Sequence, residues 1–437
     1  MGRTVHEPAR EVPIVDEADV VVVGGGPAGI GAAMAAARLG ARVLLVERYG
    51  FLGGAGSGSL VLVWDDCDDG CQKTVGGVLD ELVQAAQALG GAMVPDTDDL
   101  HRPESGLWAK WGRWGFTDWF TRRPRGAVRP ITWAACVDPE VFKHVAFERV
   151  LAAGTRLRLH SWLVEAVVQN GAVRAIIVES KSGRQALAGR VFVDASGDGD
   201  LLAAAGAPHV HGRYLGTLAH RLADVDLEEH VEWERRHSKQ AADETRAMRA
   251  IYNMTWEYWW LYTVRRGVIW ANCPTWANVD GLDVGALTEL EVEGRRRIFR
   301  ALDYARAHLP GFRDAYVADT AAVAGIRQTR LLKGAYRLTL RDVKSGRRFP
   351  DAIGRARNYW VPYRALYPAE PSNLLVAGRC YSATAEAQRM SREISGCLMT
   401  GQAAGAAAGL AVKEGVTPRE VDVCRLQAAL IEQGVLL

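Results

Sequence analysis

A run of apolar residues that ends in closely spaced glycines constrains this chain more than any other feature. Residues 19–26 read DVVVVGGG, and this β-branched run predicts a strand buried on both faces, as in a parallel sheet. Residues 27–40 (PAGIGAAMAAARLG) are rich in alanine and predict a helix, and residues 41–47 (ARVLLVE) predict a second buried strand. A β-α-β unit therefore spans residues 19–47, which is typical of an α/β fold.

The glycines between this strand and this helix have the spacing of a dinucleotide-binding turn. Gly24 permits the tight turn, Gly26 lets the backbone approach a pyrophosphate, and Gly29 lets the helix pack closely on the strand. The pyrophosphate then lies at the helix N-terminus, where free N–H groups favour negative charge. Glu47 ends the second strand, where a carboxylate accepts hydrogen bonds from ribose hydroxyls. The pattern predicts a dinucleotide site, and the second glycine pair at 53–54 favours the longer FAD over NAD.

Later segments are expected to complete the same domain. Residues 137–154 predict a helix with Asp138 as its N-cap and Pro139 in its first turn. Strands follow, joined by a hairpin turn at 170–171, which reads Asn-Gly. Further buried strands are predicted at 190–200 and 374–378, and a helix at 400–415.

Two segments rich in tryptophan interrupt these pieces. Residues 101–134 hold five tryptophans, and the more helical residues 228–310 contain the run WEYWW. Trp256, Trp259 and Trp260 have helical spacing, so part of this group is expected in a core. Other tryptophans are expected to wall an aromatic pocket.

The predicted fold class is α/β, with a Rossmann-like, discontinuous FAD-binding domain and an inserted α+β, Trp-rich substrate domain. A chain of 437 residues is long enough for two intertwined domains. We predict the FAD-binding domain over residues 1–80, 135–215 and 366–437. The substrate or cap domain is predicted over residues 81–134 and 216–365.

Composition and charge exclude several classes of partner. The formal net charge of +2 gives no reason to expect a nucleic acid partner. No apolar run reaches the roughly twenty residues of a membrane span. Seven cysteines, an odd number, with no secretory leader argue against a disulfide framework. We expect a cytoplasmic protein that binds a small-molecule substrate and no metal, and the oligomeric state stays open.

Beyond the first fifty residues, three blocks carry a resemblance to a known family. They are VDASGDGDLLAAAGAP (193–208), AGIRQTRLLKGAYRLTLRDV (324–343) and the segment 361–412, which includes LLVAGRC and SGCLMTGQAAGAAAGLAV. With VVVGGGPAGIGAA and GARVLLVERYGFLGG, they resemble the FAD-dependent oxidoreductases of the glutathione-reductase-type, fumarate-reductase-like flavoprotein superfamily. The resemblance implies an enzyme with non-covalent FAD. It does not specify the substrate, because this family hosts many chemistries.

The resemblance also implies which positions contact FAD. It places Glu47 and Arg48 at the adenosine ribose and the backbone near Val164 at the adenine. The helix that begins around 396–400 would direct its N-terminus at the N1–O2 edge of the flavin, which carries negative charge when reduced. The full set of implied positions is Gly24, Gly26, Pro27, Ala28, Gly29, Glu47, Arg48, Gly53, Gly54, Val164, Asp198, Gly378, Arg379, Gly396, Cys397 and Leu398.

The chain departs from the family pattern at two places near the expected flavin. Where relatives often read T-H-E-A, residues 384–387 read TAEA, and where relatives read R-V-M-P-T, residues 392–396 read REISG. The reaction is therefore not expected to copy that of better-matched members.

Six residues are candidates for contact with the substrate or for proton transfer. Arg364 and Arg392 could clamp a substrate carboxylate or, equally, pair with a structural one. Cys380 could react as a thiolate, although a small buried side chain is its more frequent role. Arg327 and Arg330 are expected to be structural. The six candidates are Arg364, Tyr363, Arg392, Cys380, Glu393 and His220, of which Glu393 and His220 could accept a substrate proton.

These features favour a dehydrogenase or oxidase in which a small organic substrate transfers a hydride to flavin N5. The tryptophan and arginine content suggests an aromatic or sugar-like substrate with an acid group. The alternative is an FAD-dependent monooxygenase that uses NAD(P)H and O2, although the internal DG block of aromatic hydroxylases is missing from the sequence. A non-catalytic flavoprotein is a third possibility. The electron acceptor, O2 among others, stays open.

Overall fold

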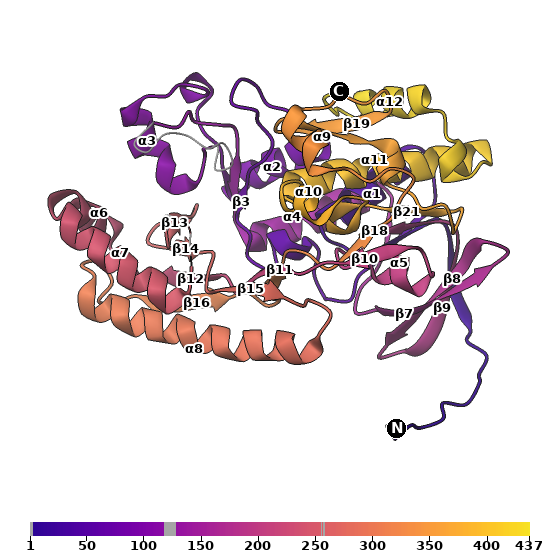
Figure 1. Ribbon diagram of the computed structural model, residues 1–437, viewed down its shortest axis with the longest axis horizontal. Coiled ribbons are helices and arrows are strands. Elements are labelled where there is room, and N and C mark those ends of the chain that lie inside the picture. Colours follow the sequence, from indigo (N-terminus) through magenta and orange to yellow (C-terminus); the bar gives the residue numbers. More distant parts are fainter. Residues whose placement is uncertain (1–2, 118–127, 255, 257) are drawn as a thin grey trace.

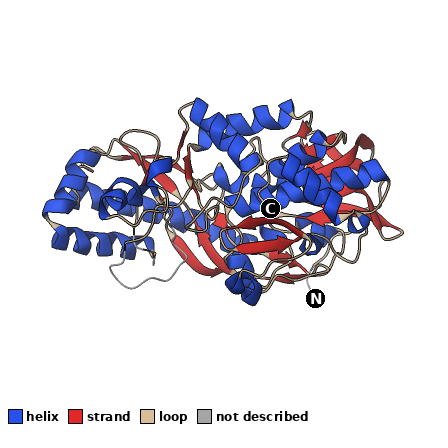
Figure 2. Ribbon diagram, turned by 90° about the horizontal axis from the view of Figure 1, so that it is seen from above, coloured by secondary structure: helices blue, strands red, loops and turns tan. Residues whose placement is uncertain are grey.

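The computed structural model describes residues 3–117, 128–254, 256 and 258–437, arranged as two bodies side by side along the longest axis (Figure 1, Figure 2). The larger body contains a seven-stranded sheet covered by α1 (Pro27–Arg38) and α11 (Ile394–Glu414). The smaller body contains an antiparallel sheet and three helices. The sequence had predicted this α/β character with a parallel nucleotide-binding sheet.

The main sheet is parallel in its centre and antiparallel at one side. Its path is β6 (Arg156–Arg158), β2 (Val43–Val46), β1 (Ile14–Val23), β9 (Gly183–Asp194), β8 (Ala172–Ser180) and β7 (Trp162–Gln169), and β21 (Leu374–Val376) pairs with β9. The first half of β9 pairs with β8, and its last three residues pair in parallel with β21. The predicted strands and the hairpin turn are confirmed, with Asn170 and Gly171 both in the left-handed region at φ 52° and 69°.

The helices α1 and α11 touch through their backbones. A Cβ atom at Gly401 would lie 2.0 Å from the carbonyl oxygen of Ala28, and one at Gly405 would lie 2.0 Å from that of Ala32. Only glycine permits this approach, which explains the small residues in both helices. The helix predicted at 400–415 begins earlier, at Ile394, and the hydroxyl of Ser395 in its first turn donates to the carbonyl of Asp65.

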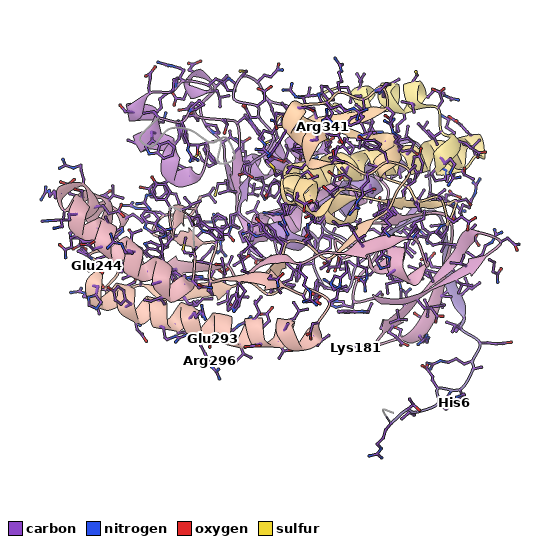
Figure 3. All side chains as sticks on the ribbon, viewed as in Figure 1. His6, Lys181, Glu244, Glu293, Arg296 and Arg341 are labelled. Carbon is purple, nitrogen blue, oxygen red and sulfur yellow. The ribbon has the colours of Figure 1, made fainter. Side chains whose placement is uncertain are left out.

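The smaller body is an antiparallel sheet with helices at its edge. Its sheet order is β13 (Leu261–Tyr262), β14 (Ile269–Ala271), β12 (His220–Ala223) and β16 (Tyr316–Thr320), and its helices are α6 (Leu227–Arg236), α7 (Ser238–Tyr252) and α8 (Val284–His308). A second sheet, β15 (Thr275–Val279), β11 (Tyr214–Thr217) and β17 (Gly325–Ile326), lies between the bodies. Glu293 and Arg296 lie on the outer face of α8, where Arg296 is exposed and Glu293 pairs with Arg297 and Arg300 (Figure 3).

Shorter elements complete the chain. They are β3 (Val63–Trp64), α2 (Val78–Ala88), β4 (Ala92–Met93), α3 (Ser105–Trp111), β5 (Ala135–Val137), α4 (Pro139–Ala152), α5 (Asp200–Ala204), β10 (His209–His211), β18 (Arg330–Leu332), α9 (Leu340–Ser345), β19 (Ala352–Ala356), β20 (Tyr359–Pro362), α10 (Ala385–Arg389) and α12 (Val423–Glu432). All seven cysteines are free. In the described ranges, no helix combines the length and apolarity that crossing a membrane requires. The predicted domain boundaries stay a prediction.

The described residues of the WEYWW segment are not in a helix. The helix α7 ends before it at Tyr252, and its C-cap Asn253 adopts the left-handed conformation with φ 52°. The prediction that Trp256, Trp259 and Trp260 lie on one face of a helix is therefore wrong. The prediction that part of it lies in a core is confirmed, because Trp259 and Trp260 are buried in the core of the smaller body. Trp119, of the other Trp-rich segment, lies outside the described residues.

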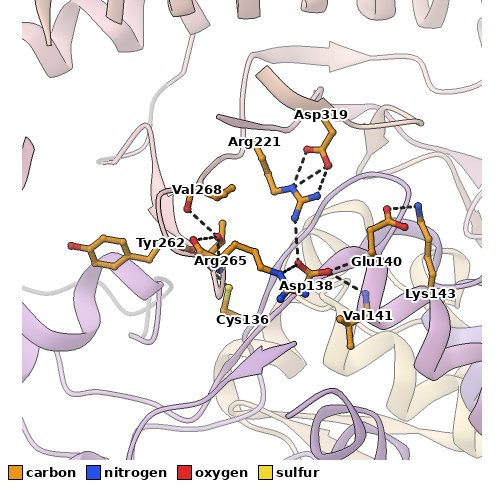
Figure 4. Close-up of polar contacts among 11 residues, drawn as sticks. Cys136, Asp138, Glu140, Val141, Lys143, Arg221, Tyr262, Arg265, Val268 and Asp319 are labelled. Carbon is orange, nitrogen blue, oxygen red and sulfur yellow. Dashed lines mark hydrogen bonds and ion pairs between the residues drawn. The ribbon is translucent and has the colours of Figure 1, made fainter. Parts of the chain in front are cut away.

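Asp138 ties the two bodies together (Figure 4). Its carboxylate accepts two backbone N–H groups in the first turn of α4, as predicted, and is the N-cap of that helix. On the other side it accepts the Nε of Arg265 at 2.9 Å and an Nη of Arg221 at 3.5 Å, and Arg221 also pairs with Asp319. Burial raises the pKa of Asp138, but the bonds from Arg265 and the helix N-terminus outweigh burial and bring it below the usual value.

Replacement of Asp138 is expected to destabilise the fold in two separable steps. Asp138→Asn keeps an oxygen that can cap α4 but removes the charge, whereas Asp138→Ala removes both. We expect losses in the free energy of unfolding of about 1–2 kcal/mol for asparagine and about 2–4 kcal/mol for alanine, measured by urea unfolding at pH 7.

The effect should depend on pH in a defined direction. Because the folded pKa of Asp138 lies below its ordinary value of 3.8, its contribution is complete above that pH and is lost as the pH falls through the folded pKa. The difference between wild type and Asp138→Asn should therefore shrink only on strong acidification. Equal stability of the three proteins at pH 7 would contradict this account.

Candidate functional site

One large cavity runs between the two bodies. Its volume is about 1190 Å³, whereas pockets for single drug-sized ligands measure roughly 300–1,000 Å³. Its walls come from the turn between β1 and α1, the ends of β2, β9 and β21, and the start of α11. The smaller body closes the other side with residues of WEYWW, β11, β14 and β17. The cavity therefore has room for a dinucleotide and a substrate together.

The three glycines of the β1–α1 turn each meet a different requirement. Gly24 has φ 100°, and a Cβ there would lie 2.5 Å from the carbonyl oxygen of Ala195. At Gly29 a Cβ would lie 1.7 Å from the carbonyl oxygen of Gly24, so helix and turn are in contact. At Gly26 the nearest atom to a Cβ is Gly54 Cα at 3.8 Å. Gly26 lines the cavity, so the space beside it is open for a ligand.

Glu47 stabilises the turn between β1 and α1 through hydrogen bonds to the backbone. Its Oε2 accepts the N–H of Gly25 at 2.6 Å, and its Oε1 accepts that of Tyr49 at 2.9 Å. The side chain lines the cavity, where burial raises the pKa of its carboxyl and the two N–H bonds oppose that rise. The predicted contact of Glu47 with a ribose stays a prediction.

The far side of the nucleotide region is cationic and aromatic. The guanidinium of Arg48 lies over the rings of Tyr49 and Trp162, at 4.9 and 5.1 Å from their centroids. Asp198 lies 3.7 Å from Arg48 and 3.3 Å from Arg379, so it holds both arginines beside the cavity. Such a flat, cationic wall is suited to an adenine ring and phosphates.

The start of α11 faces the same cavity. Glu393, Ile394 and Cys397 all line it, and no described side chain caps the helix. The free N–H groups of a 21-residue helix therefore point toward the cavity and favour negative charge there. Beside them, the Nε atoms of Arg379 and Arg392 are buried without a hydrogen-bond partner in the described structure.

A sequence model of one protein family matches nearly all of the chain. The family is described as FAD dependent oxidoreductase, and the matches cover residues 19–358 and 355–430. The chain belongs to this family of FAD-dependent oxidoreductases. It is therefore an enzyme, an oxidoreductase that binds FAD.

Solved structures with similar folds have low sequence identity to this oxidoreductase. A geranylgeranyl bacteriochlorophyll reductase-like protein from Thermoplasma acidophilum is 13% identical, with a TM-score of 0.48 over 96% of this chain and 84% of that one. The p-nitrophenol 4-monooxygenase of Pseudomonas putida is 13% identical, with a TM-score of 0.47 over 95% and 84%. The anhydrotetracycline hydroxylase of Streptomyces rimosus is 15% identical, with a TM-score of 0.47 over 95% and 66%. These similarities are too low to assign a reaction.

The residues of the cavity fit FAD. The open space at Gly26, the uncapped start of α11 and the unpartnered Nε of Arg379 all present N–H donors or free volume to an anionic, elongated ligand. Most of the positions implied by the family resemblance line this cavity: Gly24, Gly26, Pro27, Ala28, Glu47, Arg48, Gly54, Val164, Asp198, Gly378, Arg379 and Cys397. Their individual contacts to FAD stay a prediction.

Four of the implied positions lie behind the wall instead. Gly29 contacts the turn, as described above. A Cβ at Gly53 would lie 2.6 Å from Ser57 Oγ, and one at Gly396 would lie 2.9 Å from the Tyr359 hydroxyl. Leu398 is buried in the core of the larger body. These residues let neighbouring segments pack closely and do not line the cavity.

Two of the six catalytic candidates line the cavity, Arg392 and Glu393, and the other four do not. Tyr363 is buried and donates to the carbonyl of Pro418. Arg364 pairs with Asp351 and stacks on Tyr336 at 4.9 Å. These two side chains are already engaged in structural contacts.

Cys380 and His220 are also engaged away from the cavity. Burial raises the pKa of the Cys380 thiol, and its Sγ contacts the carbonyl of Ala377, which fits the small-side-chain role that the sequence favoured. His220 bonds the Cys273 carbonyl and the Tyr252 hydroxyl, and burial lowers its pKa to about 4, so it is neutral at pH 7. A buried neutral histidine with both ring nitrogens occupied has no free atom for a substrate.

The sequence interpretation missed Asp65 and Asp66. Asp65 lines the cavity, and its carboxyl has no hydrogen bond or ion pair to a described residue. Asp66 adopts the left-handed conformation at φ 66°, accepts the Tyr359 hydroxyl at 2.9 Å and pairs with Arg357. A signal was present, because two acids directly follow the apolar run LVLVW at 60–64.

Electrostatics distinguish Asp65 from an ordinary surface acid. Burial, then the negative charges of Glu393 and Asp66, raise its pKa well above the usual value, against the positive charges of Arg357 and Arg392. Burial likewise raises the pKa of Asp66 to about 7. A carboxyl that faces a cavity and has a raised pKa is a candidate for accepting and releasing a proton there.

Proposed function

We propose that this protein is an FAD-dependent dehydrogenase or oxidase of a small organic substrate, in which Asp65 accepts the proton that the substrate loses. The proposal rests on one observation. The Asp65 carboxyl has no partner among the described residues, and it lines the same cavity as the turn between β1 and α1. Oxidation of an alcohol or amine removes a hydride from carbon and a proton from oxygen or nitrogen. A base beside the substrate is needed for the second of these.

The surrounding residues support this role. Ser395 donates its hydroxyl to the backbone carbonyl of Asp65 at 2.6 Å, which positions Asp65 beside the first turn of α11. Glu393 occupies the N-cap position of that helix and pairs with Arg392 at 3.0 Å, so it holds a neighbouring cation in place. Asp65 is the carboxyl left free to exchange a proton with a ligand.

FAD, when bound, supplies the two-electron acceptor for the hydride. The chain's own residues bind and orient the substrate, take the proton at Asp65 and exclude water through the tryptophans of the smaller body. The reduced enzyme is then reoxidised by O2 or by another electron acceptor.

The test is anaerobic reduction of the purified holoenzyme, followed by its visible spectrum. NADH and NADPH are added separately, and then a panel of aryl alcohols, primary amines, 2-hydroxy acids and 2-amino acids. The proposal predicts that neither nicotinamide bleaches the flavin band rapidly and that a member of the panel does. Rapid bleaching by NADH or NADPH would overturn it in favour of a monooxygenase or an NAD(P)H-driven reductase.

A further inference from the structure

Arg327 lines the cavity with a backbone held by hydrogen bonds and a guanidinium that has no described polar partner. Its backbone is fixed, because its N–H donates to the carbonyl of Leu215 at 3.1 Å and its carbonyl accepts the amide of Gln388 at 3.0 Å. Its guanidinium lines the cavity and lies 5.3 Å from the ring centroid of Trp256. No ion pair or hydrogen bond joins this guanidinium to any described residue. The sequence favoured a structural role for Arg327, but its guanidinium makes no structural ion pair or hydrogen bond within the described residues.

Each of the other arginines that line the cavity has at least one described partner, although the Nε atoms of Arg379, Arg389 and Arg392 have none. Arg330, expected to be structural, pairs with Asp200 at 3.1 Å, and Arg392 pairs with Glu393 at 3.0 Å. Arg48 and Arg379 share Asp198, as described above. Arg389 donates to the carbonyl of Arg213 at 3.3 Å and lies over Tyr214. Among the described lining residues, Arg327 is the arginine whose donors are all free for a ligand.

The charge of Arg327 is poorly compensated. Burial and the positive charge of Arg392 lower its pKa to about 10, and Glu393, Tyr214 and Asp65 only partly oppose that change. A buried cation without a partner is unfavourable, and an anion that pairs with it restores the balance. Stacking on Trp256 leaves the edge of the guanidinium, with its forked N–H groups, free for a carboxylate.

We propose that Arg327 binds a carboxylate of the substrate, and that the substrate is an organic acid with an aromatic or apolar part. This inference rests on the proposed function and adds the substrate class. The aromatic wall for the apolar part consists of Trp256, Tyr258, Trp259 and Trp270, all of which line the cavity. Asp65 lines the same cavity, where it would take the proton from the oxidised group.

The test compares an acid with its neutral amide. Wild-type holoenzyme is titrated with phenylacetate and with phenylacetamide, and binding is followed by the change in the flavin absorption band and by tryptophan fluorescence. We expect the acid to bind roughly 10- to 100-fold more tightly than the amide, the usual effect of a hydrogen-bonded charge pair. Arg327→Gln should bind both alike, and Arg327→Lys should keep part of the preference because it keeps the charge.

Arg389→Gln is the matched control, because it removes the same charge from the same cavity at a guanidinium that is already engaged. It should keep the preference for the acid. Equal affinity of the wild type for acid and amide, or no binding of either up to about 10 mM, would overturn the proposal. So would loss of the preference in Arg389→Gln to the same extent as in Arg327→Gln, which would show a general effect of charge.

The carboxylate-site proposal and the dehydrogenase or oxidase proposal can be overturned independently by these measurements. A preference for the acid together with rapid flavin bleaching by NADPH would keep the carboxylate site and overturn the dehydrogenase or oxidase proposal. Substrate-dependent bleaching with no preference for acids would do the reverse. Because the comparison of acid and amide is made in the wild type, the proposal stays falsifiable if Arg327→Gln does not fold.

Discussion

Asp65→Asn is expected to lower kcat by about 10²- to 10⁴-fold, the usual contribution of a general base, with FAD still bound. Asparagine has nearly the same shape as aspartate, so the bond from Ser395 to the backbone carbonyl of residue 65 is kept. What is lost is the proton acceptor. The measurement is the rate of anaerobic flavin reduction by a substrate found in the panel, in a stopped-flow spectrometer.

The pH profile separates a base from a residue that only shapes the cavity. In the wild type, kcat should fall as the pH drops through the raised pKa of Asp65, because the protonated carboxyl cannot accept a proton. That pKa reflects burial and the charges of Glu393, Asp66, Arg357 and Arg392. In Asp65→Asn this acidic limb should disappear.

Asp69→Asn is the matched control for Asp65→Asn. Asp69 lies four residues away, pairs with Arg355 and does not line the cavity. Its replacement should leave kcat within about twofold of the wild-type value, because it touches no ligand. If Asp65→Asn reduces the flavin at the wild-type rate, Asp65 is not the proton acceptor.

Gly26→Ala should weaken FAD binding by roughly 10- to 100-fold without destabilising the protein. The added methyl carbon meets no described atom closer than Gly54 Cα at 3.8 Å, so the polypeptide itself accommodates it. The methyl group would instead occupy the space expected for the pyrophosphate. FAD affinity is measured by the recovery of flavin fluorescence on dissociation, and stability by the melting temperature of the apoprotein.

Gly106→Ala serves as the control, because a Cβ there has no neighbour within 4 Å and Gly106 does not line the cavity. It should leave FAD affinity unchanged, and alanine in the helix α3 should leave the melting temperature unchanged or raise it slightly. Wild-type FAD affinity in Gly26→Ala would mean that the cofactor does not pass beside Gly26. A large fall in the melting temperature of the apoprotein would instead assign Gly26 to the packing of the turn.

Local sequence patterns were sufficient to predict the nucleotide-binding half of the fold. Apolar runs and glycine spacing depend on neighbouring residues only. The strands predicted at 19–26 and 41–47 and the helix predicted at 27–40 are accordingly observed, at Ile14–Val23, Val43–Val46 and Pro27–Arg38. The cap at Asp138 and the turn at 170–171 follow from the same local rules.

The substrate side could not be predicted in this way. Asp65 lies in the acidic segment WDDCDDG, which is typical of a solvated loop. Its position and its raised pKa depend in part on Ser395 and Glu393, over 300 residues away. Arg327 was expected to be structural because the sequence does not show which arginines find acids. Conversely, Arg364 lies close in sequence to the last cofactor strand, yet its side chain pairs with Asp351.

The backbone contact between α1 and α11 has a consequence for how the protein is made. The helix α1 (Pro27–Arg38) is synthesised before its partner α11, which begins only at Ile394. At about 5–20 residues per second, that interval lasts roughly 20 to 70 s. During this time the alanine face of α1 lacks its native cover, so the cofactor site cannot close before α11 has been made. Acquisition of FAD is therefore expected to follow the synthesis of α11.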